Sequence, residues 1–323
     1  MVITNSKNKS VKFTCYNPIN YMRIDFPNAT ATWIDLLTPT KDEAKLLLEE
    51  KRVPLNFIDE LVSVSERPQV GLSDGAIYVV LHFPKSYKES GESFEVDFII
   101  GKDYVITAHY EQIQALDHFK KIMEVESATN RGSAQNGFFI FSAILIRLYE
   151  TMFDELEAVE SAIKDVEDRI FSGQEKRMVF ALSNLSRSMI NFRKALDPHE
   201  RILHQLFEAM DKLGMDGEET AHKASIMNSF EKVKMSLKSQ NEILRELQET
   251  NSAMLSTKQN EIMKTLTIVV FLTMPMSLIA AILTIPTSNT PFIGHPDDFW
   301  LILGGMGAVV IALLIFVRLR KWI

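Results

Sequence analysis

The stretch that decides the fold runs from Asn260 to Thr284 and reads NEIMKTLTIVVFLTMPMSLIAAILT. It begins polar and continues through about 20 apolar residues, enough for a helix to cross a ~30 Å hydrocarbon core. A second apolar run from Phe299 to Val317 follows after a short polar loop. Because two helices cannot enclose a solvated path by themselves, we expect a membrane protein that acts as an oligomer.

Basic residues flank these two runs on one side only. Lys258 and Lys264 precede the first run, and Arg318, Arg320 and Lys321 follow the second, whereas the loop between the runs contains no lysine or arginine. Lysine and arginine collect on the cytoplasmic side of a membrane. The sequence therefore predicts a two-span protein of the inner or plasma membrane, with both termini in the cytoplasm and the loop outside.

The region before the membrane runs predicts a mixed α and β domain. Runs rich in Ile, Val and Tyr, bounded by turn signals, are typical of strands. The predicted strands cover residues 32–37, 76–83, 94–100 and 104–107. Thr38 and Pro39 are a suitable N-cap and first residue for a helix that continues to about Arg52. Further helices are predicted after Pro54 and over residues 111–125.

Strand signals then disappear and long helices follow. Apolar residues from Ile144 to Ile163 recur at steps of three and four, and Gly173 ends this helix. A second long helix is predicted over 176–207, with a kink or restart at Pro198. Beyond residue 221 the only strong breaker is Pro275, so we expect a rod of about 100 Å that packs against the preceding hairpin.

These patterns predict the following fold class: an α+β cytoplasmic domain followed by long helices and two C-terminal transmembrane helices. The predicted segments are a cytoplasmic α/β domain (1–128), a helical hairpin (138–212), a stalk helix that continues into the first span (218–284), an external loop (285–298), the second span (299–317) and a basic cytoplasmic tail (318–323).

Several classes of function are disfavoured by composition and motifs. A net charge of −7 without a basic face argues against nucleic acid as a partner. We find no glycine-rich phosphate loop after a strand, no nucleophile elbow, and no set of nucleophile, base and orienting group. The sequence therefore predicts neither an enzyme nor a protein with an organic cofactor.

One set of positions in the first span repeats with alternating steps of three and four, so it forms a stripe that can face its copies in a symmetric bundle. The stripe consists of Asn260, Met263, Thr267, Val270, Met274, Ser277, Ala281 and Thr284. In one interpretation, its small polar residues hold helices together. In the other, polar rings alternate with apolar constrictions along a pore.

The chemistry of the stripe and of its external end favours a hydrated cation. No ionisable side chain lies on the stripe, which argues against a proton relay or a dehydrating site. Mg²⁺ loses its water reluctantly and would suit such a path. Asp297 and Asp298 lie in a loop without basic residues, where they would concentrate cations. Alternatively, they begin the second transmembrane helix.

The sequence also resembles the CorA family of magnesium channels over essentially its whole length. The resemblance rests on TWIDLLTPT, on ERPQV leading to YVVLHFP, on the long central helical pair with SAILIRLYETMFDELEAVESAIKDVEDRIF, on KQNEIMKTLTIVVFLTMPMSLIA, and on the terminal RLRKWI. It implies a funnel-shaped homopentamer in which the stalk helix continues into the pore, the second transmembrane helix lies outside it, and the termini are cytoplasmic.

The resemblance also assigns residues in the pore. Asn260 stands where the family has an asparagine at the cytoplasmic end of the pore. Met263, Leu266 and Met274 match its apolar constrictions, and Ser277 stands where the family usually has threonine.

The sequence departs from the family at the Gly-Met-Asn signature that holds the first hydrated ion at the external end. Without gaps, this chain has Thr-Ile-Pro there, ending at Pro286. With a three-residue insertion it has Thr-Ser-Asn instead, and Asn289 could supply a ring of five amide oxygens. In the first register that ring is missing. Both registers remain open, so Pro286 and Asn289 join Asp297 and Asp298 as candidates for the external mouth.

Together these observations predict a homopentameric channel for hydrated divalent cations, with Mg²⁺ uptake as the main activity and lipid as the surrounding partner. The resemblance implies gating by divalent cations at the cytoplasmic domain, with Glu249 as a candidate ligand. Arg318, Arg320 and Lys321 would form a basic cytoplasmic ring and anchor the topology. The alternatives are a transporter of Zn²⁺, Co²⁺ or Ni²⁺, and a non-conducting membrane scaffold or sensor.

Overall fold

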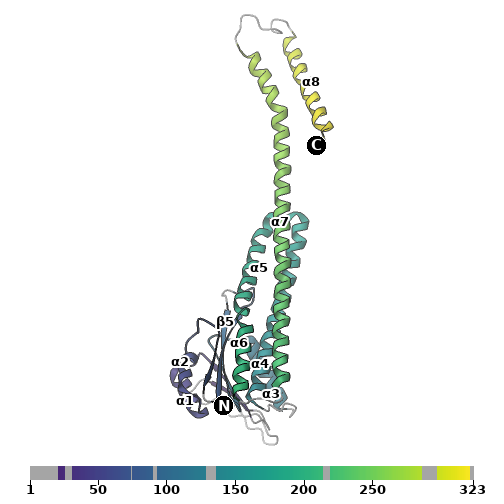
Figure 1. Ribbon diagram of the computed structural model, residues 1–323. Coiled ribbons are helices and arrows are strands. Elements are labelled where there is room, and N and C mark those ends of the chain that lie inside the picture. Colours follow the sequence, from purple (N-terminus) through teal and green to yellow (C-terminus); the bar gives the residue numbers. More distant parts are fainter. Residues whose placement is uncertain are drawn as a thin grey trace. The chain divides into compact units, whose positions relative to one another are not determined.

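The computed structural model describes residues 21–25, 31–73, 75–89, 93–128, 136–213, 219–285 and 297–320 (Figure 1). The chain divides into two compact units, Met1–Leu247 and Gln248–Ile323. One helix, α7 (Glu219–Leu283), begins in the first unit and ends in the second.

The first unit is built on a six-stranded sheet with the order β1-β2-β6-β5-β4-β3. The strands are β1 (Tyr21–Asp25), β2 (Thr32–Leu37), β3 (Gln69–Ser73), β4 (Ala76–Pro84), β5 (Ser93–Ile100) and β6 (Tyr104–His109). Only β2 and β6 pair in parallel, and the other neighbours are antiparallel. The four predicted strands are confirmed. Two edge strands, β1 and β3, were not predicted from the sequence.

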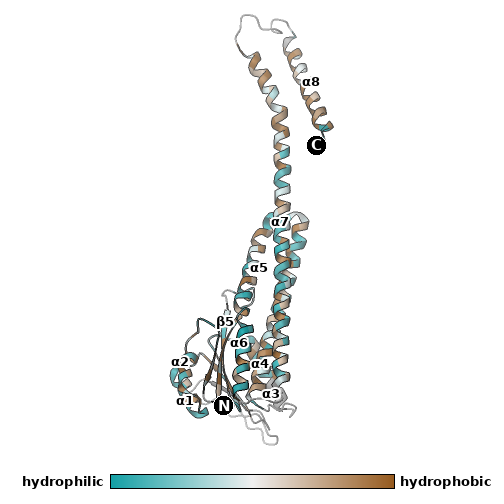
Figure 2. Ribbon diagram, in the orientation of Figure 1, coloured by the Kyte–Doolittle hydropathy of each residue, from teal (hydrophilic) through white to brown (hydrophobic). Residues whose placement is uncertain are grey.

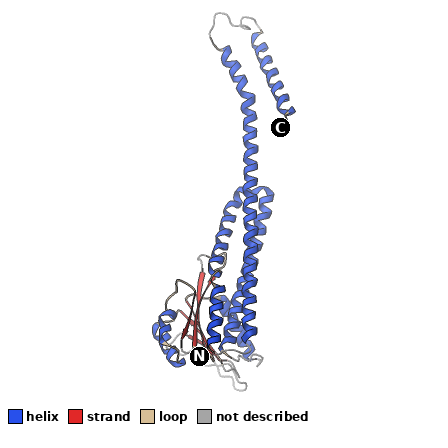
Figure 3. Ribbon diagram, viewed as in Figure 1, coloured by secondary structure: helices blue, strands red, loops and turns tan. Residues whose placement is uncertain are grey.

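Helices cover both faces of this sheet, as Figure 3 shows for the strands in red and the helices in blue. One face packs on α1 (Lys41–Lys51), on a short 3₁₀ turn (Leu55–Phe57) and on α2 (Ile58–Leu61), around a buried apolar cluster. The other face meets α3 (Gln114–Ala128) and α4 (Gly137–Arg169) through the ring pairs Trp33–Phe119 and Phe98–Phe141. Because successive side chains of a strand point to opposite faces, neighbouring strand residues pack into two separate cores.

The start of α1 differs from the prediction. Thr38 has a left-handed φ of 50° and is not the N-cap; Thr40 is. The Thr40 hydroxyl accepts from the Glu43 amide at 3.3 Å, and the Glu43 carboxylate accepts from the Thr40 amide at 2.8 Å. This reciprocal capping box satisfies two helix-end donors and outweighs the preference of Pro39 for the first helical turn.

The predicted helix over 111–125 begins later, at Gln114. The backbone carbonyl of Glu111 lies 2.7 Å from Nδ1 of His109 at the end of β6, which fixes Glu111 in the connection before the helix.

The long helices follow the predicted breaks. Gly173 has a φ of 91° inside a π-helical turn (Ile170–Gln174) that separates α4 from α5 (Glu175–Leu196). Pro198 precedes α6 (His199–Lys212), so the predicted second helix is two helices with a restart at the proline. No break interrupts α7 at Pro275.

The first part of α7 is a packed helix rather than a solvated single rod. Its buried residues recur at steps of three and four, and all but the polar Gln240 are apolar: Ile226, Phe230, Val233, Leu237, Gln240, Leu244 and Leu247. The Phe230 ring lies 5.8 Å from that of Tyr149 on α4, and the Gln240 side-chain amide donates to the Leu156 carbonyl at 2.8 Å. The expected packing against the hairpin is confirmed.

A buried charged cluster joins β2, β6 and α3. Asp35 is 3% exposed, and one of its oxygens lies 2.7 Å from Nζ of Lys120 and 3.2 Å from Nε2 of His109. Its other oxygen accepts from the Thr107 hydroxyl, which in turn accepts from the Trp33 indole at 2.9 Å. Burial would raise the pKa of Asp35, but His109 and Lys120 hold that pKa below its ordinary value.

We expect Lys120→Met to destabilise the first unit by about 3 kcal/mol, because it leaves the Asp35 carboxylate buried without its nearest cation. Urea unfolding of the full-length protein in detergent measures the loss, followed by the fluorescence of Trp33 in a background in which Trp300 and Trp322 are replaced by Phe. Lys121→Met is the matched control, since Lys121 is exposed. Equal unfolding midpoints for the two variants would contradict a stabilising role for this ion pair.

Candidate functional site: the membrane segment of α7

Within the described part of the chain, two helices are long and apolar enough to span a membrane: α7, in its final part, and α8 (Asp298–Leu319). Figure 2 shows the apolar residues of both in brown. Almost none of either apolar stretch is buried inside the protein. Exposed apolar surface of this extent suits lipid or further copies of the chain.

One face of the α7 span contacts α8. Ile268 is only 8% exposed, and the ring of Phe271 lies 6.4 Å from that of Phe316 on α8. Val317, the next residue on α8, is fully buried. Ile268 and Ser277 are nine residues apart, two and a half turns, so they lie on opposite sides of α7. The face with Ser277 is therefore left open by α8.

The predicted stripe lies on this open face. Met263, Val270 and Met274 are 53%, 49% and 71% exposed. The other stripe residues are also exposed: Asn260, Thr267, Ser277, Ala281 and Thr284, as is Leu266 at its edge. The structure thus brings together the stripe positions on one uncovered helix face, within a single chain.

The hydroxyl groups of the stripe have a fixed role. Thr267 donates to the Met263 carbonyl at 2.8 Å, Ser277 to the Thr273 carbonyl at 3.1 Å, and Thr284 to the Ala281 carbonyl at 2.8 Å. A hydroxyl has one hydrogen and two lone pairs. Because each hydrogen is committed to the helix backbone, these oxygens present only acceptors to the open face.

Thr273 shares this behaviour, although the stripe pattern did not include it. Its hydroxyl donates to the Val269 carbonyl at 3.0 Å, and its side chain is exposed. In the sequence, Thr273 is a hydroxyl residue directly before the stripe residue Met274. A stripe defined by strict steps of three and four therefore leaves it out. Between Lys264 and Ile285 the chain has no ionisable side chain. This span thus presents only neutral oxygens and apolar side chains.

The two ends of the spans are described only in part. Asp297 is exposed and occupies the N-cap position of α8 without a side-chain capping hydrogen bond. Asp298 is the first residue of α8, but its side chain lies outside the described residues. Pro286, Asn289 and Lys321 also lie outside them. Both registers of the external signature therefore stay predictions.

At the other end of α8, Arg318 and Arg320 are exposed, and the Arg320 guanidinium lies 5.7 Å from the ring centre of Phe316. This contact holds the cation against its own helix. Glu249 is exposed on α7. Among the described residues, no group of three or more potential ligands could hold a metal ion. A regulatory site at Glu249 would therefore need ligands from another copy or from residues that are not described.

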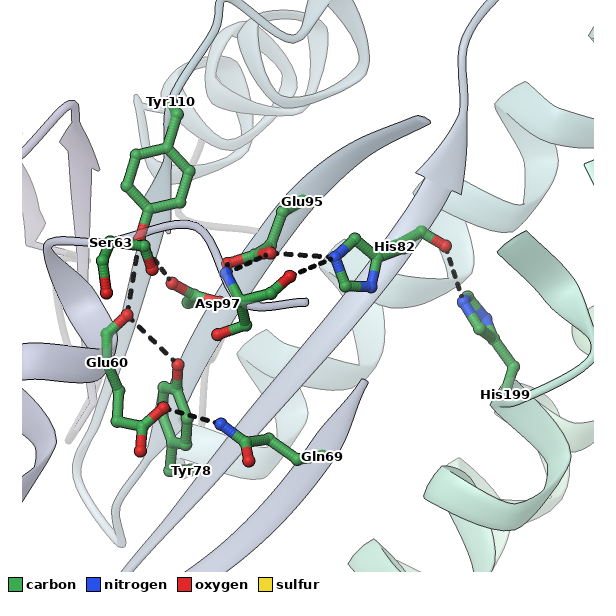
Figure 4. A network of polar contacts seen from close by, with 10 residues as sticks. Glu60, Ser63, Gln69, Tyr78, His82, Glu95, Asp97, Tyr110 and His199 are labelled. Carbon is green, nitrogen blue, oxygen red and sulfur yellow. Dashed lines mark hydrogen bonds and ion pairs between the residues drawn. The ribbon is translucent and has the colours of Figure 1, made fainter. Parts of the chain in front are cut away.

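Two acidic residues inside the sheet, Glu95 and Asp97 on β5, were not among the predicted functional residues. Both are buried, at 4% and 0% exposure. The sequence does show two acids at alternate positions of a largely apolar strand, SFEVDFII, and this pattern could have indicated a buried acidic pair. They form a network of their own within the first unit (Figure 4).

Comparison with known proteins identifies a family that matches this chain. The family described as CorA-like Mg²⁺ transporter protein matches residues 28–320. The cobalt/magnesium transport protein CorA of Thermotoga maritima is 22% identical, over 92% of this chain and 84% of the relative. The protein of the same name from Methanocaldococcus jannaschii is 20% identical, over 93% of this chain and 94% of the relative.

The solved structure of the CorA magnesium transporter from Methanocaldococcus jannaschii has a TM-score of 0.77 and 19% identity, over 93% of this chain and 94% of that chain. It confirms the predicted fold class. The family consists of transporters, so the prediction that this protein is not an enzyme is also confirmed. The chain belongs to the family of CorA-like Mg²⁺ transporter proteins.

Proposed function

We propose that this protein is a membrane channel for hydrated divalent cations and that the open face of α7 lines its pore. The observation that carries the proposal is the stripe itself, where hydroxyl oxygens that can only accept alternate with apolar side chains. Polar groups facing lipid carry a free-energy cost, so this face is better placed against water or other copies.

The acceptor-only surface matches a cation that keeps its water. Water bound to a cation points its hydrogens outward, and those hydrogens need acceptors. Mg²⁺ holds its water strongly and usually keeps several waters in protein sites, so it is the ion that we propose as the main substrate. The names of the two relatives, which are cobalt/magnesium transport proteins, support a divalent cation.

The assembly that we propose is a homopentamer. One chain leaves the stripe uncovered, and a ring of copies would turn it into a closed path with α8 outside. Met263 and Met274 would then form rings that can exclude water and close the pore. The resemblance to the family supplies the number five.

In this assembly the ion would gather near Asp297 and Asp298, enter past Thr284 or Asn289, and leave past Asn260. We propose that divalent cations bound between cytoplasmic units hold the channel closed. When the internal Mg²⁺ concentration falls, acidic side chains such as that of Glu249 would lose their bridging ion and repel one another.

Transport by pure protein is the direct test. We expect full-length protein in liposomes loaded with a fluorescent indicator to take up Mg²⁺, and an ion-competition series with Co²⁺, Ni²⁺ and Zn²⁺ to rank Mg²⁺ among the permeant ions. Preference for another ion would show a transporter of a different metal. Absence of uptake for all four ions would reject the channel and leave a scaffold or sensor.

A matched pair of threonines tests the role of the stripe. Thr267 and Thr265 both donate to the carbonyl four residues earlier, at 2.8 and 3.0 Å, but they lie on different faces of α7. We expect Thr267→Val to lower the Mg²⁺ flux about fivefold, the effect of losing about 1 kcal/mol of hydrogen bonding per acceptor. Thr265→Val should leave it unchanged. Similar losses in both variants would argue against a pore on this face.

A further inference from the structure

Glu95 and Asp97 lie on the same face of β5, because side chains two residues apart in a strand point the same way. This is the face covered by α1 and α2. Figure 4 shows the two carboxyl groups side by side, between His82 on β4 and Tyr110 after β6. In the part of the chain that the structure describes, no lysine or arginine forms an ion pair with either acid.

Glu95 is surrounded by donors. The backbone amide of Ser65 lies 3.0 and 2.9 Å from its two oxygens, and Nε2 of His82 lies 2.8 Å from one of them. A carboxylate accepts such bonds, so both oxygens of Glu95 have hydrogen-bond partners.

Asp97 has a different environment. One of its oxygens is buried without a hydrogen-bond partner among the described residues, and the other lies 3.1 Å from the Tyr110 hydroxyl. That hydroxyl has a single hydrogen, yet it also lies 3.1 Å from the Ser63 carbonyl and 3.4 Å from the Glu60 carbonyl. If Asp97 is protonated, it donates to Tyr110, and Tyr110 donates to Ser63. If Asp97 is ionised, one of these acceptors loses its hydrogen.

The surrounding charges favour the protonated form of Asp97. Burial, and then the charge of Glu95, raise the pKa of Asp97 to about 9. Tyr78 on β4 and Tyr110 after β6 also face Asp97, Glu60 on α2 faces these two tyrosines, and His82 on β4 faces Glu95. His82 is the only one of these that can carry a positive charge, and its ring nitrogen is bound to Glu95.

The same cluster holds the end of α2 and the start of its connection to β3, residues 60–65, which we call the 60–65 strap. Two of its carbonyl groups accept from tyrosine hydroxyls. The Tyr78 hydroxyl on β4 donates to the Glu60 carbonyl at 3.4 Å, and the Tyr110 hydroxyl, just after β6, lies 3.1 Å from the Ser63 carbonyl. Ser65 is bound through its amide to Glu95, and its carbonyl lies 3.1 Å from Nε2 of His82. The strap is therefore fastened to the sheet through the groups around the two acids.

We propose that Asp97, Glu95 and Tyr110 form a proton-dependent clasp, in which one proton retained on Asp97 keeps the 60–65 strap closed. Opening the strap exposes Asp97 to water, where it releases this proton. The clasp thereby makes the opening of the 60–65 strap in the first unit depend on pH. It does not depend on whether the protein conducts ions.

The sign of the dependence follows from linkage. The closed state keeps the proton up to a pH of about 9, whereas an exposed aspartate has an ordinary pKa of 3.8. The stabilising effect of the proton is complete below pH 3.8 and is lost as the pH rises toward 9. Between these limits the opening constant of the strap rises by up to about tenfold per pH unit.

Hydrogen exchange measured by mass spectrometry on the full-length protein in detergent tests the clasp. After correction for intrinsic chemical exchange, the opening constant of peptides covering the strap should rise by up to about tenfold per unit between pH 6 and 8. Asp97→Asn carries an amide that cannot ionise, and it should remove this dependence. The control is Asp59→Asn on α2, an exposed carboxylate that pairs with Lys41 at the surface. A pH dependence that persists in Asp97→Asn would overturn the proposal.

Infrared spectroscopy of the wild-type protein with ¹³C-labelled aspartate gives a readout that needs no variant. We expect a protonated-carboxyl band at pH 7 that disappears near pH 9. If Asp97→Asn folds, this band should be missing from its spectrum. Absence of the band from the wild-type protein at pH 7 would show that Asp97 is ionised, and the clasp would be rejected.

Discussion

A polar group within the hydrocarbon of a membrane has to face water or a partner, and this constraint governs the second unit. The α7 span is apolar on the side that meets α8, where Ile268 is buried and Phe271 contacts Phe316. The opposite side carries the exposed side chains of Thr267 and Ser277. Because α8 leaves that side open, the same asymmetry supports both the proposed assembly of several copies and the proposed pore.

The first unit contains buried acids that also need partners. Asp35 is ionised because Lys120 and His109 lie against it on one face of the sheet. On the other face Asp97 has no such cation among the described residues, and its environment favours a neutral acid. The surroundings of the two acids thus differ, because Asp35 has a cation within hydrogen-bond distance and Asp97 has a second acid beside it. We expect the first arrangement to stabilise the fold, and the clasp that we propose around Asp97 would make part of it depend on pH.

Periodicity and strong breakers made most of the fold predictable from the sequence. Gly173 and Pro198 mark real helix boundaries, and the absence of breakers after residue 221 predicted the length of α7. The edge strand β3 was missed because a half-exposed strand of five residues has little apolar pattern. The Asp97 clasp was also missed, since its partners are distant in the sequence and meet only through strand pairing and the fold of α2. The stripe was predictable because one helix carries it, whereas the external signature lies outside the described residues.

The central claim is that the open face of α7 lines a water-filled path, and cysteine accessibility tests it most directly. Cys15 is the only native cysteine, so Cys15→Ser gives a background for single cysteines at Val270, Met274 and Ser277, with Ile268 and Leu272 as controls. In liposomes, a charged water-soluble thiol reagent should modify the first three positions and reduce the Mg²⁺ flux, and it should leave the two controls unmodified. Modification of Ile268 and Leu272 with protection of the stripe would contradict the account.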